Sequence, residues 1–335
     1  MIRLRLPQIP ERLRRPDLRL PEGVGPDVED CLASGTLLLE QAGIGTARLD
    51  AECLLAHVLG CPRWQVILDR TRHLAPQEFC RYLRLLQRRE QREPLAYLLG
   101  AREFWSLSFS VSPGVLIPRP ETESLVEAAV AVCRTLESER SLPAPPPGTR
   151  APAPLGLAIV DLCTGSGAVA IALARELPGS RIIATDSSWR ALRVARANAE
   201  AHGVADRLMF LRGDLWRALA PAQPGTARVD VVVANPPYIP SGAVESLMPE
   251  VQWEPRVALD GGPDGLRVLG QLIATTPPNL RAGGFLLLEI GADQALAVVR
   301  MIETTHDFEP PRVLQDLAGR DRVVVARRRG ADGTS

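Results

Sequence analysis

The sequence predicts an α/β protein in which a doubly wound, mostly parallel sheet follows a small helical domain. From residue 155 onward, apolar strand-like runs alternate with amphipathic helical patterns, which is typical of a parallel sheet covered on both faces. Before residue 93 the apolar spacing is helical instead. The 335 residues leave room for one large domain or two ordinary ones, and an apolar content of 46% excludes a wholly disordered chain.

The N-terminal part of the chain divides into a tail and a helical domain. Residues 1–25 combine six Arg with four Pro and show no clear period, so we expect a disordered or loosely attached tail. Residues 26–100 form the predicted helical domain. One of its helices is expected to begin after an N-cap at Asp50 and to end at Gly60, and another spans about residues 76–92.

The second of these helices carries arginines along one side. Arg81, Arg84, Arg88 and Arg92 are spaced as neighbours on a helix face, and we call them the basic ridge. A solvated helix face is the ordinary explanation of such a pattern. A docking surface for an acidic or RNA-like partner is the alternative.

The apolar period changes from helical to extended between residues 101 and 122, which predicts a β-hairpin linker. Its turn is placed at Ser112, Pro113 and Gly114, because proline and glycine favour turns. A helix resumes at residue 123, and the six prolines of residues 141–154 indicate an exposed loop. Residues 123–330 form the predicted second domain, which contains the sheet.

Charge and cysteine usage argue against several classes of protein. The 39 basic residues balance 39 acidic ones, which disfavours a dedicated nucleic-acid coat. The six cysteines are scattered without metal-ligand spacing, so we expect reduced thiols in a cytoplasmic protein and no metal. No apolar run reaches the ~18 residues that span a bilayer, and the tail lacks the apolar segment of a signal peptide, so no membrane association is expected.

The first candidate site lies in the turn after the first strand of the alternating region. It comprises Asp161, Cys163, Thr164, Gly165, Ser166 and Gly167. In an open α/β sheet a ligand lies beyond the carboxyl ends of the strands, where glycines allow close approach and a helix N-terminus offers unpaired N–H groups. Cys163 and Ala170 break the G-x-G-x-x-G dinucleotide fingerprint. An acid followed by small residues instead suits a zwitterionic ligand.

Acidic residues also end the next two strands. Asp186 stands where such folds place a carboxylate on ribose hydroxyls, although an N-cap of the following helix would use the same residue type. Asp214 and Leu215 end the third strand and could contact the edge and the face of an adenine ring. Taken together, the three strand ends predict one adenosyl-binding site.

The fourth strand ends in Asn235, Pro236, Pro237 and Tyr238. Because neither proline has an N–H group, the carbonyls of Asn235 and Pro236 are rigid and available as acceptors. Asn235 adds a side-chain carbonyl and Tyr238 a ring face. This set suits a planar substrate with an NH₂ group. We therefore predict Asn235, Pro236 and Tyr238 as catalytic and the whole tetrapeptide as substrate-binding, with an ordinary Pro-Pro turn as the alternative.

These motifs together resemble the class I S-adenosylmethionine-dependent methyltransferases that act on nitrogen, and more narrowly the release factor glutamine methyltransferases of the PrmC/HemK family. The similarity covers about residues 50–325. It is carried by DAECLLAHVLG, EPLAYLLGAREFW, VLIPRPETE, VDLCTGSGAVAIALA, NPPYIP, WEPRVALDGGPDGL and GGFLLLEIG. VLIPRPETE together with the helical domain is specific to the family, whereas Asn-Pro-Pro-Tyr is shared with several nitrogen methyltransferases.

The resemblance implies a Rossmann-like, seven-stranded methyltransferase domain over residues 123–330 and S-adenosylmethionine as cofactor. The implied substrate is the side-chain amide nitrogen (N5) of the glutamine in the Gly-Gly-Gln loop of peptide chain release factors. By the resemblance, residues 163–167, Asp186, Leu215 and Asn235 would contact the cofactor, and residues 235–238 would contact the glutamine. The helical domain would recognise the substrate protein. We expect a monomer with no direct nucleic-acid partner.

Two residues depart from the family pattern. Cys163 stands where the family usually has Gly, and Leu215 stands where some members have an aromatic residue, with Trp216 one place later. Three other functions stay open, namely a glutamine methyltransferase of a ribosomal protein, a methyltransferase of exocyclic amines in RNA or DNA, and a non-catalytic adaptor with the same fold. The neutral charge disfavours the nucleic-acid enzyme, and the intact Asn-Pro-Pro-Tyr disfavours the adaptor.

Overall fold

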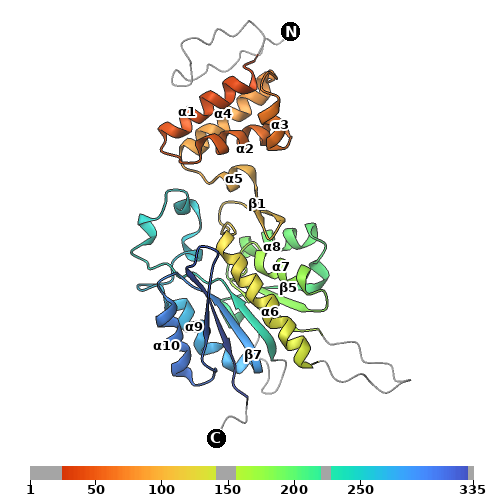
Figure 1. Ribbon diagram of the computed structural model, residues 1–335, viewed down its shortest axis with the longest axis vertical. Coiled ribbons are helices and arrows are strands. Elements are labelled where there is room, and N and C mark those ends of the chain that lie inside the picture. The colour runs from red at the N-terminus through yellow and green to blue at the C-terminus, as the bar shows by residue number, and fades with distance from the viewer. Residues whose placement is uncertain (1–24, 141–155, 220–227, 331–335) are drawn as a thin grey trace, which may run out of the picture. The chain divides into compact units, whose positions relative to one another are not determined.

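The computed structural model describes residues 25–140, 156–219 and 228–330, and these residues form two compact units (Figure 1). The helical unit comprises residues 25–100 and 248–253, and the sheet unit comprises the other described residues. The predicted tail up to residue 24 and the proline-rich loop at 141–154 lie outside the described residues. The short segment 248–253 was not expected in the helical unit.

In the helical unit, amphipathic helices surround one apolar core that includes Leu32, Leu54 and Leu86. The helices are α1 (Val28–Gln41), α2 (Ala47–Leu59), α3 (Arg63–Leu68), α4 (Pro76–Glu90) and α5 (Leu95–Leu99). α2 ends at Gly60 in the left-handed conformation, as glycine allows. The helix expected over 76–92 is thus observed as α4.

Asp50 is not the N-cap of α2, so that prediction is wrong. The helix begins after Thr46, and Asp50 lies in its first turn. The Asp50 carboxylate is buried and accepts a hydrogen bond from Arg89 Nε at 2.7 Å. Arg89 is buried as well, and its Nη2 donates to Glu250 at 2.8 Å. A buried arginine is stable only when acidic side chains pair with it. The ion pair of Arg89 with Glu250 therefore connects segment 248–253 to the helices.

Two members of the basic ridge already have acidic partners within the helical unit. Arg88 donates to both carboxylate oxygens of Glu93, at 2.7 and 2.6 Å. Arg92 donates to Glu250 at 2.8 Å. These ion pairs neutralise two of the four arginines of the basic ridge. The suggested role of the ridge as a docking surface stays a prediction.

The hairpin forms, but its turn lies earlier in the chain than predicted. Strands β1 (Ala101–Phe104) and β2 (Leu107–Ser110) are joined by Trp105 and Ser106, both at positive φ of 52° and 55°. Two-residue hairpin turns need this geometry, which usually selects Asn and Gly. The Trp105 N–H donates to the Glu123 carboxylate at 2.7 Å, a contact that helps to hold the turn.

The residues 112–114 form a separate turn, in which the Val115 N–H bonds to the Ser112 carbonyl at 3.1 Å. The hairpin is also more than a linker. Phe104 and Phe109 are buried in the core of the sheet unit, so residues 101–122 belong to that unit.

Among the described residues, a seven-stranded sheet has the order β5-β4-β3-β6-β7-β9-β8. Its strands are β3 (Ala158–Leu162), β4 (Arg181–Asp186), β5 (Leu208–Arg212), β6 (Val229–Ala234), β7 (Leu280–Glu289), β8 (Arg312–Gln315) and β9 (Asp321–Arg327). β3 to β7 pair in parallel, and β9 is antiparallel to both of its neighbours. The predicted fold class is confirmed. The antiparallel pair of β7 and β9 is not at the edge of the sheet, because β8 pairs with the outer side of β9.

Helices cover both faces of this sheet (Figure 1). The apolar core on one face includes or contacts three helices, α6 (Glu123–Arg140), α7 (Ala168–Glu176) and α8 (Trp189–Ala201). The apolar core on the other face includes residues of α9 (Arg267–Thr275) and α10 (Ala295–Thr305). Successive side chains of β6 alternate between the two cores, with Val231 and Val233 on one face and Val232 and Ala234 on the other. β6 is therefore buried along its length and presents Asn235 from the rigid centre of the sheet.

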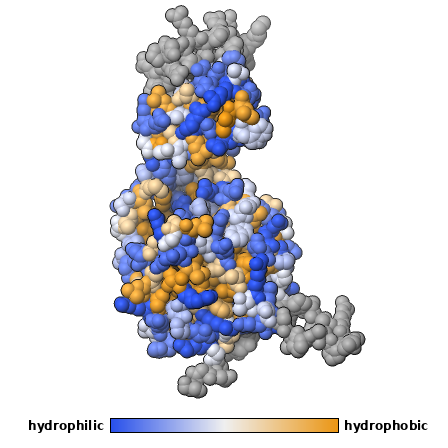
Figure 2. Space-filling view, in the orientation of Figure 1, coloured by the Kyte–Doolittle hydropathy of each residue, from blue (hydrophilic) through white to orange (hydrophobic). Residues whose placement is uncertain are grey.

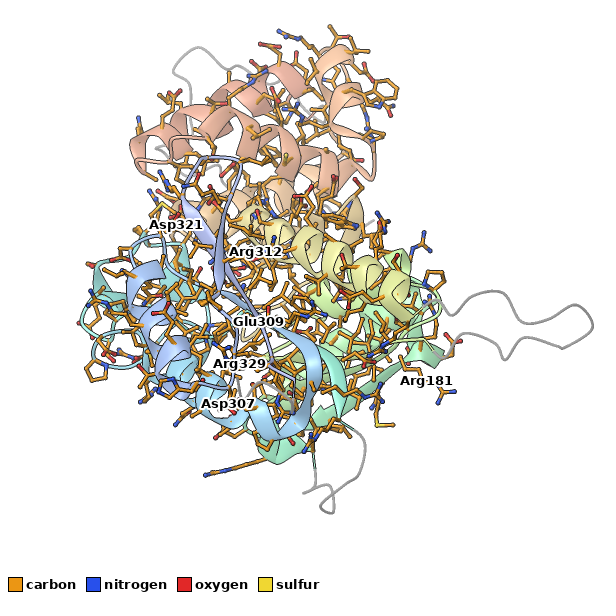
Figure 3. All side chains as sticks on the ribbon, turned by 60° about the horizontal axis from the view of Figure 1, so that its bottom comes forward. Arg181, Asp307, Glu309, Arg312, Asp321 and Arg329 are labelled. Carbon is orange, nitrogen blue, oxygen red and sulfur yellow. The ribbon has the colours of Figure 1, made fainter. Side chains whose placement is uncertain are left out.

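Charged side chains protect the β8 edge. Arg312 begins β8 and is exposed, and Asp321 begins the neighbouring β9 (Figure 3). Gln315 at the end of β8 donates to Asp321 at 3.2 Å. Exposed charge at an edge strand disfavours pairing with a strand of another molecule.

At the amino end of β6, away from Asn235, the side chain of Asp230 anchors three elements. Its buried carboxylate accepts hydrogen bonds from Arg140 at 2.5 Å, from Arg281 at 2.8 Å and from the Ala158 N–H at 2.8 Å. Burial by itself raises the pKa of Asp230, but these hydrogen bonds and the two positive charges together hold the pKa below its ordinary value. Asp230 thus links α6, β3 and β7.

Replacing Asp230 with Asn should lower the free energy of unfolding by about 1–3 kcal/mol at neutral pH, because two arginines lose their charged acceptor. The pKa of Asp230 is lower in the folded than in the unfolded state. Its contribution is therefore present above the unfolded pKa and is lost as pH falls through the folded pKa. Urea unfolding across the acid range measures both effects. The exposed Asp206→Asn should change stability little, and an equal loss in the two variants would contradict this role for Asp230.

Candidate active site

A cavity of about 630 Å³ lies at the carboxyl ends of the sheet strands, within the sheet unit. Small-molecule sites typically measure roughly 300–1,000 Å³. The predicted site residues that line this main cavity are Cys163, Gly165, Asp186, Asp214, Leu215, Asn235 and Pro237. A recess of about 40 Å³ is lined by several of them and also by Asp161, Thr164 and Ser166. Gly167, Pro236 and Tyr238 are not among the lining residues, although they adjoin them in the chain.

The turn after β3 needs glycine at Gly167. This residue has φ +82° and begins α7. A Cβ at this position would lie 3.0 Å from the Ala195 side chain and 3.1 Å from that of Ile171. Gly165 has φ +58°, and a Cβ there would meet nothing within 4 Å. The open space at Gly165 lets a bound group approach the backbone closely.

Cys163 takes a backbone conformation that favours glycine. Its φ is +64°, a region that is unfavourable for a residue with a side chain by about 1–2 kcal/mol. This geometry agrees with the glycine that the resemblance leads us to expect at this position. Burial raises the pKa of the Cys163 thiol, and the nearby Asp186 and Asp161 raise it further. The thiol is therefore neutral at physiological pH and unsuited to act as a nucleophile.

Asp186 holds the turn and lines the main cavity. Its carboxylate accepts hydrogen bonds from the Gly165 N–H at 2.9 Å and from the Ser188 N–H at 2.8 Å. The N-cap of α8 is Ser188, not Asp186, so the N-cap alternative for Asp186 is wrong. Burial raises the pKa of Asp186, while the backbone hydrogen bonds oppose that change. Each carboxylate oxygen has acceptor capacity left for a ligand hydroxyl.

Asp161 is the buried acid of the recess. It accepts a hydrogen bond from the Thr164 hydroxyl at 2.6 Å and is only 1% exposed. Burial raises the pKa of Asp161 to about 7, against the opposing effect of the hydrogen bond from Thr164. Asp161 thus supports the turn through the hydrogen bond from Thr164.

The end of β5 contributes less polar chemistry than expected. The Asp214 side chain is largely exposed and approaches Arg217 at 4.0 Å. Leu215 lines the main cavity with φ +49°. Trp216 does not take the place of the aromatic residue that the resemblance implies at position 215, because its ring packs against the core on the α9 face and its Nε1 donates to Thr276 at 3.1 Å.

Hydrogen bonds from other elements hold the tetrapeptide after β6. Asn235 Nδ2 donates to the Thr122 hydroxyl at 3.1 Å. The Tyr238 hydroxyl donates to Glu289 at 3.1 Å. Gln294 Nε2 donates to the Tyr238 carbonyl at 2.9 Å. Burial raises the pKa of Tyr238, and Glu289 raises it further, so its hydroxyl keeps its proton.

A glycine-rich loop lies directly against the same tetrapeptide. A Cβ at Gly261 would lie 2.8 Å from the Pro237 carbonyl, and one at Gly265, with φ +77°, would lie 2.3 Å from the Tyr238 carbonyl. Ile239 pairs with Asp260 in a parallel bridge. These contacts explain why the glycines of the DGGPDGL segment are needed beside the tetrapeptide.

The segment before α6 is also fixed by a buried acid. Glu254 accepts a hydrogen bond from the Ile117 N–H at 3.0 Å and forms an ion pair with Arg119. Arg119 and Thr122 line the recess. Arg119 and Thr122 lie in VLIPRPETE, Glu254 in WEPRVALDGGPDGL and Glu289 in GGFLLLEIG, and none of the four was predicted as a site residue.

Three further features of the described residues concern metal ligands, cysteines and membrane-spanning helices. No group of three or more His, Cys, Asp or Glu side chains in them is placed to hold a metal ion. All six cysteines are described, and each is a free thiol. Every helix within residues 25–140, 156–219 and 228–330 is too short or too polar to cross a membrane.

Comparison with known proteins decides the family. Family models match the PrmC N-terminal domain at residues 30–100 and the methyltransferase small domain at residues 150–251. The release factor glutamine methyltransferase of Moorella thermoacetica is 40% identical over 302 residues, which cover 90% of this chain and 99% of the relative. The enzymes of that name from Geobacter sulfurreducens and Cereibacter sphaeroides are 39% and 40% identical, covering 86% and 89% of this chain and 92% and 97% of theirs. The chain belongs to the release factor glutamine methyltransferase family.

The predicted family and enzyme class are thereby confirmed. As a release factor glutamine methyltransferase family member, the protein is a methyltransferase that uses S-adenosylmethionine. The main cavity fits this cofactor, because it combines the open backbone at Gly165 with the half-buried carboxylate of Asp186 at a volume suited to a nucleoside.

Replacing Cys163 with Gly should raise the free energy of unfolding by up to about 1 kcal/mol, because glycine takes φ +64° without strain. Cys163→Ala is the matched control, since it removes the thiol but keeps the strained Cβ. Urea unfolding of the two variants measures the difference. If Cys163→Ala stabilises as much as Cys163→Gly does, strain at this residue is not the reason.

Proposed function

We propose that this protein transfers a methyl group from S-adenosylmethionine to the side-chain amide nitrogen of the glutamine in the Gly-Gly-Gln loop of peptide chain release factors. The observation that carries the proposal is the placement of Asn235. Its Nδ2 is engaged by Thr122, while the residue lines both the main cavity and the recess. Its side-chain oxygen is then the end available to accept a hydrogen from a substrate amide.

The strand ends would hold the cofactor in the main cavity. Asp186 would accept hydrogen bonds from the ribose hydroxyls, and Leu215 would cover the adenine. Residues 163–167 and Asp161 would surround the methionine end, where the open backbone at Gly165 gives room. Asp214, whose side chain is exposed, would contribute at the adenine edge.

Residues 235–238 would hold and orient the glutamine. An amide nitrogen is a poor nucleophile because its lone pair is delocalised into the carbonyl. Asn235 Oδ1 and the Pro236 carbonyl would accept the two amide hydrogens, localise the lone pair and stabilise the positive charge that develops on nitrogen. When bound, S-adenosylmethionine supplies an activated methyl group, so the main task of these residues is placement. The proton is lost to water after transfer.

The helical unit would recognise the protein substrate, because a Gly-Gly-Gln loop offers few contacts for selecting one protein. Trp64 and Leu68, four residues apart on α3, are 62% and 75% exposed. Exposed apolar residues interrupt the hydrophilic surface of each unit on the face in Figure 2. Aromatic residues are enriched at protein interfaces, which supports a role for α3. A release factor substrate also favours a cytoplasmic location.

Replacing Asp186 with Ala should weaken S-adenosylmethionine binding by about tenfold or more, which corresponds to the loss of about 1.5–3 kcal/mol from a charged hydrogen bond. Titration calorimetry on the full chain measures this affinity. The exposed Asp206→Ala serves as a control that should bind normally. Unchanged affinity in Asp186→Ala would remove Asp186 from the cofactor site.

Replacing Asn235 with Ala should abolish methyl transfer while leaving cofactor affinity within about threefold, because Asn235 acts mainly on the transition state. The assay is transfer of radiolabelled methyl to an unmodified release factor by the wild-type and substituted enzymes. A release factor with Gln→Ala in the tripeptide is the substrate control. Labelling of that control, or no labelling of the unmodified factor by wild type, would contradict the proposed function.

A further inference from the structure

A buried glutamine contacts the end of the tetrapeptide of residues 235–238. Gln294 stands directly before α10 and is 7% exposed. Its Nε2 donates a hydrogen bond to the Tyr238 carbonyl at 2.9 Å, and its Oε1 accepts one from the Gly291 N–H at 2.9 Å. Gln294 is not among the residues that line the main cavity or the recess. Its contact with the site therefore passes through the tetrapeptide.

The two partners of Gln294 fix the orientation of its amide. A backbone N–H can only donate a hydrogen bond, and a backbone carbonyl can only accept one. The Gln294 oxygen must therefore face Gly291, and its NH₂ group must face Tyr238. A glutamate of the same length has no hydrogen to donate when it is ionised, and a methionine has none at any pH. The contact thus depends on the amide itself and not only on the size of the side chain.

Neighbouring groups leave the Tyr238 carbonyl little room to move. A Cβ at Gly265 would collide with this carbonyl oxygen and would lie 2.7 Å from Gln294 Nε2, so the glycine-rich loop packs directly against the hydrogen bond. The Tyr238 hydroxyl donates to Glu289 Oε1 at 3.1 Å. Tyr238 is thus held at its hydroxyl by Glu289 and at its carbonyl by Gln294, and one segment, residues 289–294, supplies both partners.

The two prolines make the tetrapeptide stiff. The rings of Pro236 and Pro237 fix φ at about −65°, which leaves few backbone torsions to absorb a displacement at Tyr238. A Cβ at Gly261 would lie 2.8 Å from the Pro237 carbonyl, so this peptide is closely packed as well. A displacement of the Tyr238 carbonyl is therefore passed on to the Pro236 carbonyl. A displacement of about 1 Å that starts far from the chemistry can lower a rate by about 100-fold.

We propose that Gln294 is a positioning residue that holds the backbone of residues 235–238 where the Asn235 oxygen and the Pro236 carbonyl can receive the glutamine amide. This inference rests on the proposed function. Gln294 affects the rate of transfer more than the binding of S-adenosylmethionine, because its hydrogen bond reaches the tetrapeptide and not the turn after β3. A role in folding alone would instead lower stability and leave kcat of the folded enzyme unchanged.

Two substitutions of similar size separate the donor from the bulk of the side chain. Gln294→Met removes the donor at every pH, and Gln294→Glu removes it where the carboxyl group is ionised. On unmodified release factor at about pH 8, both variants should lower kcat by about tenfold or more, while cofactor Kd from titration calorimetry stays within about twofold. Gln41→Glu, an exposed change at the end of α1, should keep wild-type kcat. Wild-type kcat in Gln294→Met would overturn the proposal.

The pH dependence distinguishes positioning from general destabilisation. Once it is protonated, the carboxyl group in Gln294→Glu can donate to the Tyr238 carbonyl as the amide does. Its kcat relative to wild type should therefore rise as pH falls, whereas the ratio for Gln294→Met should stay low and constant. The charged groups at or beside this segment, Glu289, Asp293 and Arg322, are common to all three proteins, so their effects cancel in the ratio. A ratio for Gln294→Glu that stays low at acid pH contradicts the proposal.

A second measurement does not depend on turnover. Tyr-Ile and Pro-Tyr each occur once in the sequence, at residues 238–239 and 237–238, so paired ¹³C′ and ¹⁵N labelling of these residue types assigns the Tyr238 and Pro237 carbonyl resonances. In the free protein, Gln294→Met should move both resonances, because the displacement passes along the stiff backbone, and Gln41→Glu should move neither. Movement of the Tyr238 resonance alone, or of neither resonance, in Gln294→Met would refute the proposal. Failure of wild type to methylate release factor would overturn the proposed function and leave this measurement decisive.

Discussion

The register of three parallel strands determines where the site lies. Leu162 of β3 pairs with Thr185 of β4 and with Ala234 of β6. The next residues, Cys163, Asp186 and Asn235, therefore leave the sheet side by side. Because each strand is held by ladder hydrogen bonds and by apolar cores on both faces, these side chains start from fixed positions. Preorganisation of this kind is what a reaction that depends on placement requires.

Buried polar groups then refine the positions that the sheet provides. Asp186 holds the glycine turn on β4, Thr122 accepts a hydrogen bond from Asn235, and Glu289 accepts one from the Tyr238 hydroxyl. A buried acid without partners is unfavourable, so each of these groups restrains its neighbours strongly. The same burial raises the pKa of Asp161 and Glu289 to about 7.

In the helical unit, buried charged groups hold one segment of the chain in place. Arg89 is buried between Asp50 and Glu250, and Glu250 belongs to a segment that follows the tetrapeptide of residues 235–238 in the chain. Arg92 binds the same acid. Two hydrogen bonds, one to each carboxylate oxygen of Glu250, thus fix segment 248–253 within the helical unit. Through this segment, the chain passes from the tetrapeptide into the helical unit and back.

The sequence by itself determined the fold class, the strand ends that carry the site and the family, because these depend on local periodicity and on motifs of a few adjacent residues. Tertiary structure alone decided the roles of Asp50, Thr122 and Glu289. Asn235 and Thr122 are 113 positions apart, and Tyr238 and Glu289 are 51 apart, so no local pattern pairs them. The hairpin turn at Trp105 and Ser106 was missed for the same reason, since contacts such as the one from Glu123 hold two residues that seldom favour it. Local sequence specifies which side chains stand at each strand end, and long-range packing specifies their orientation.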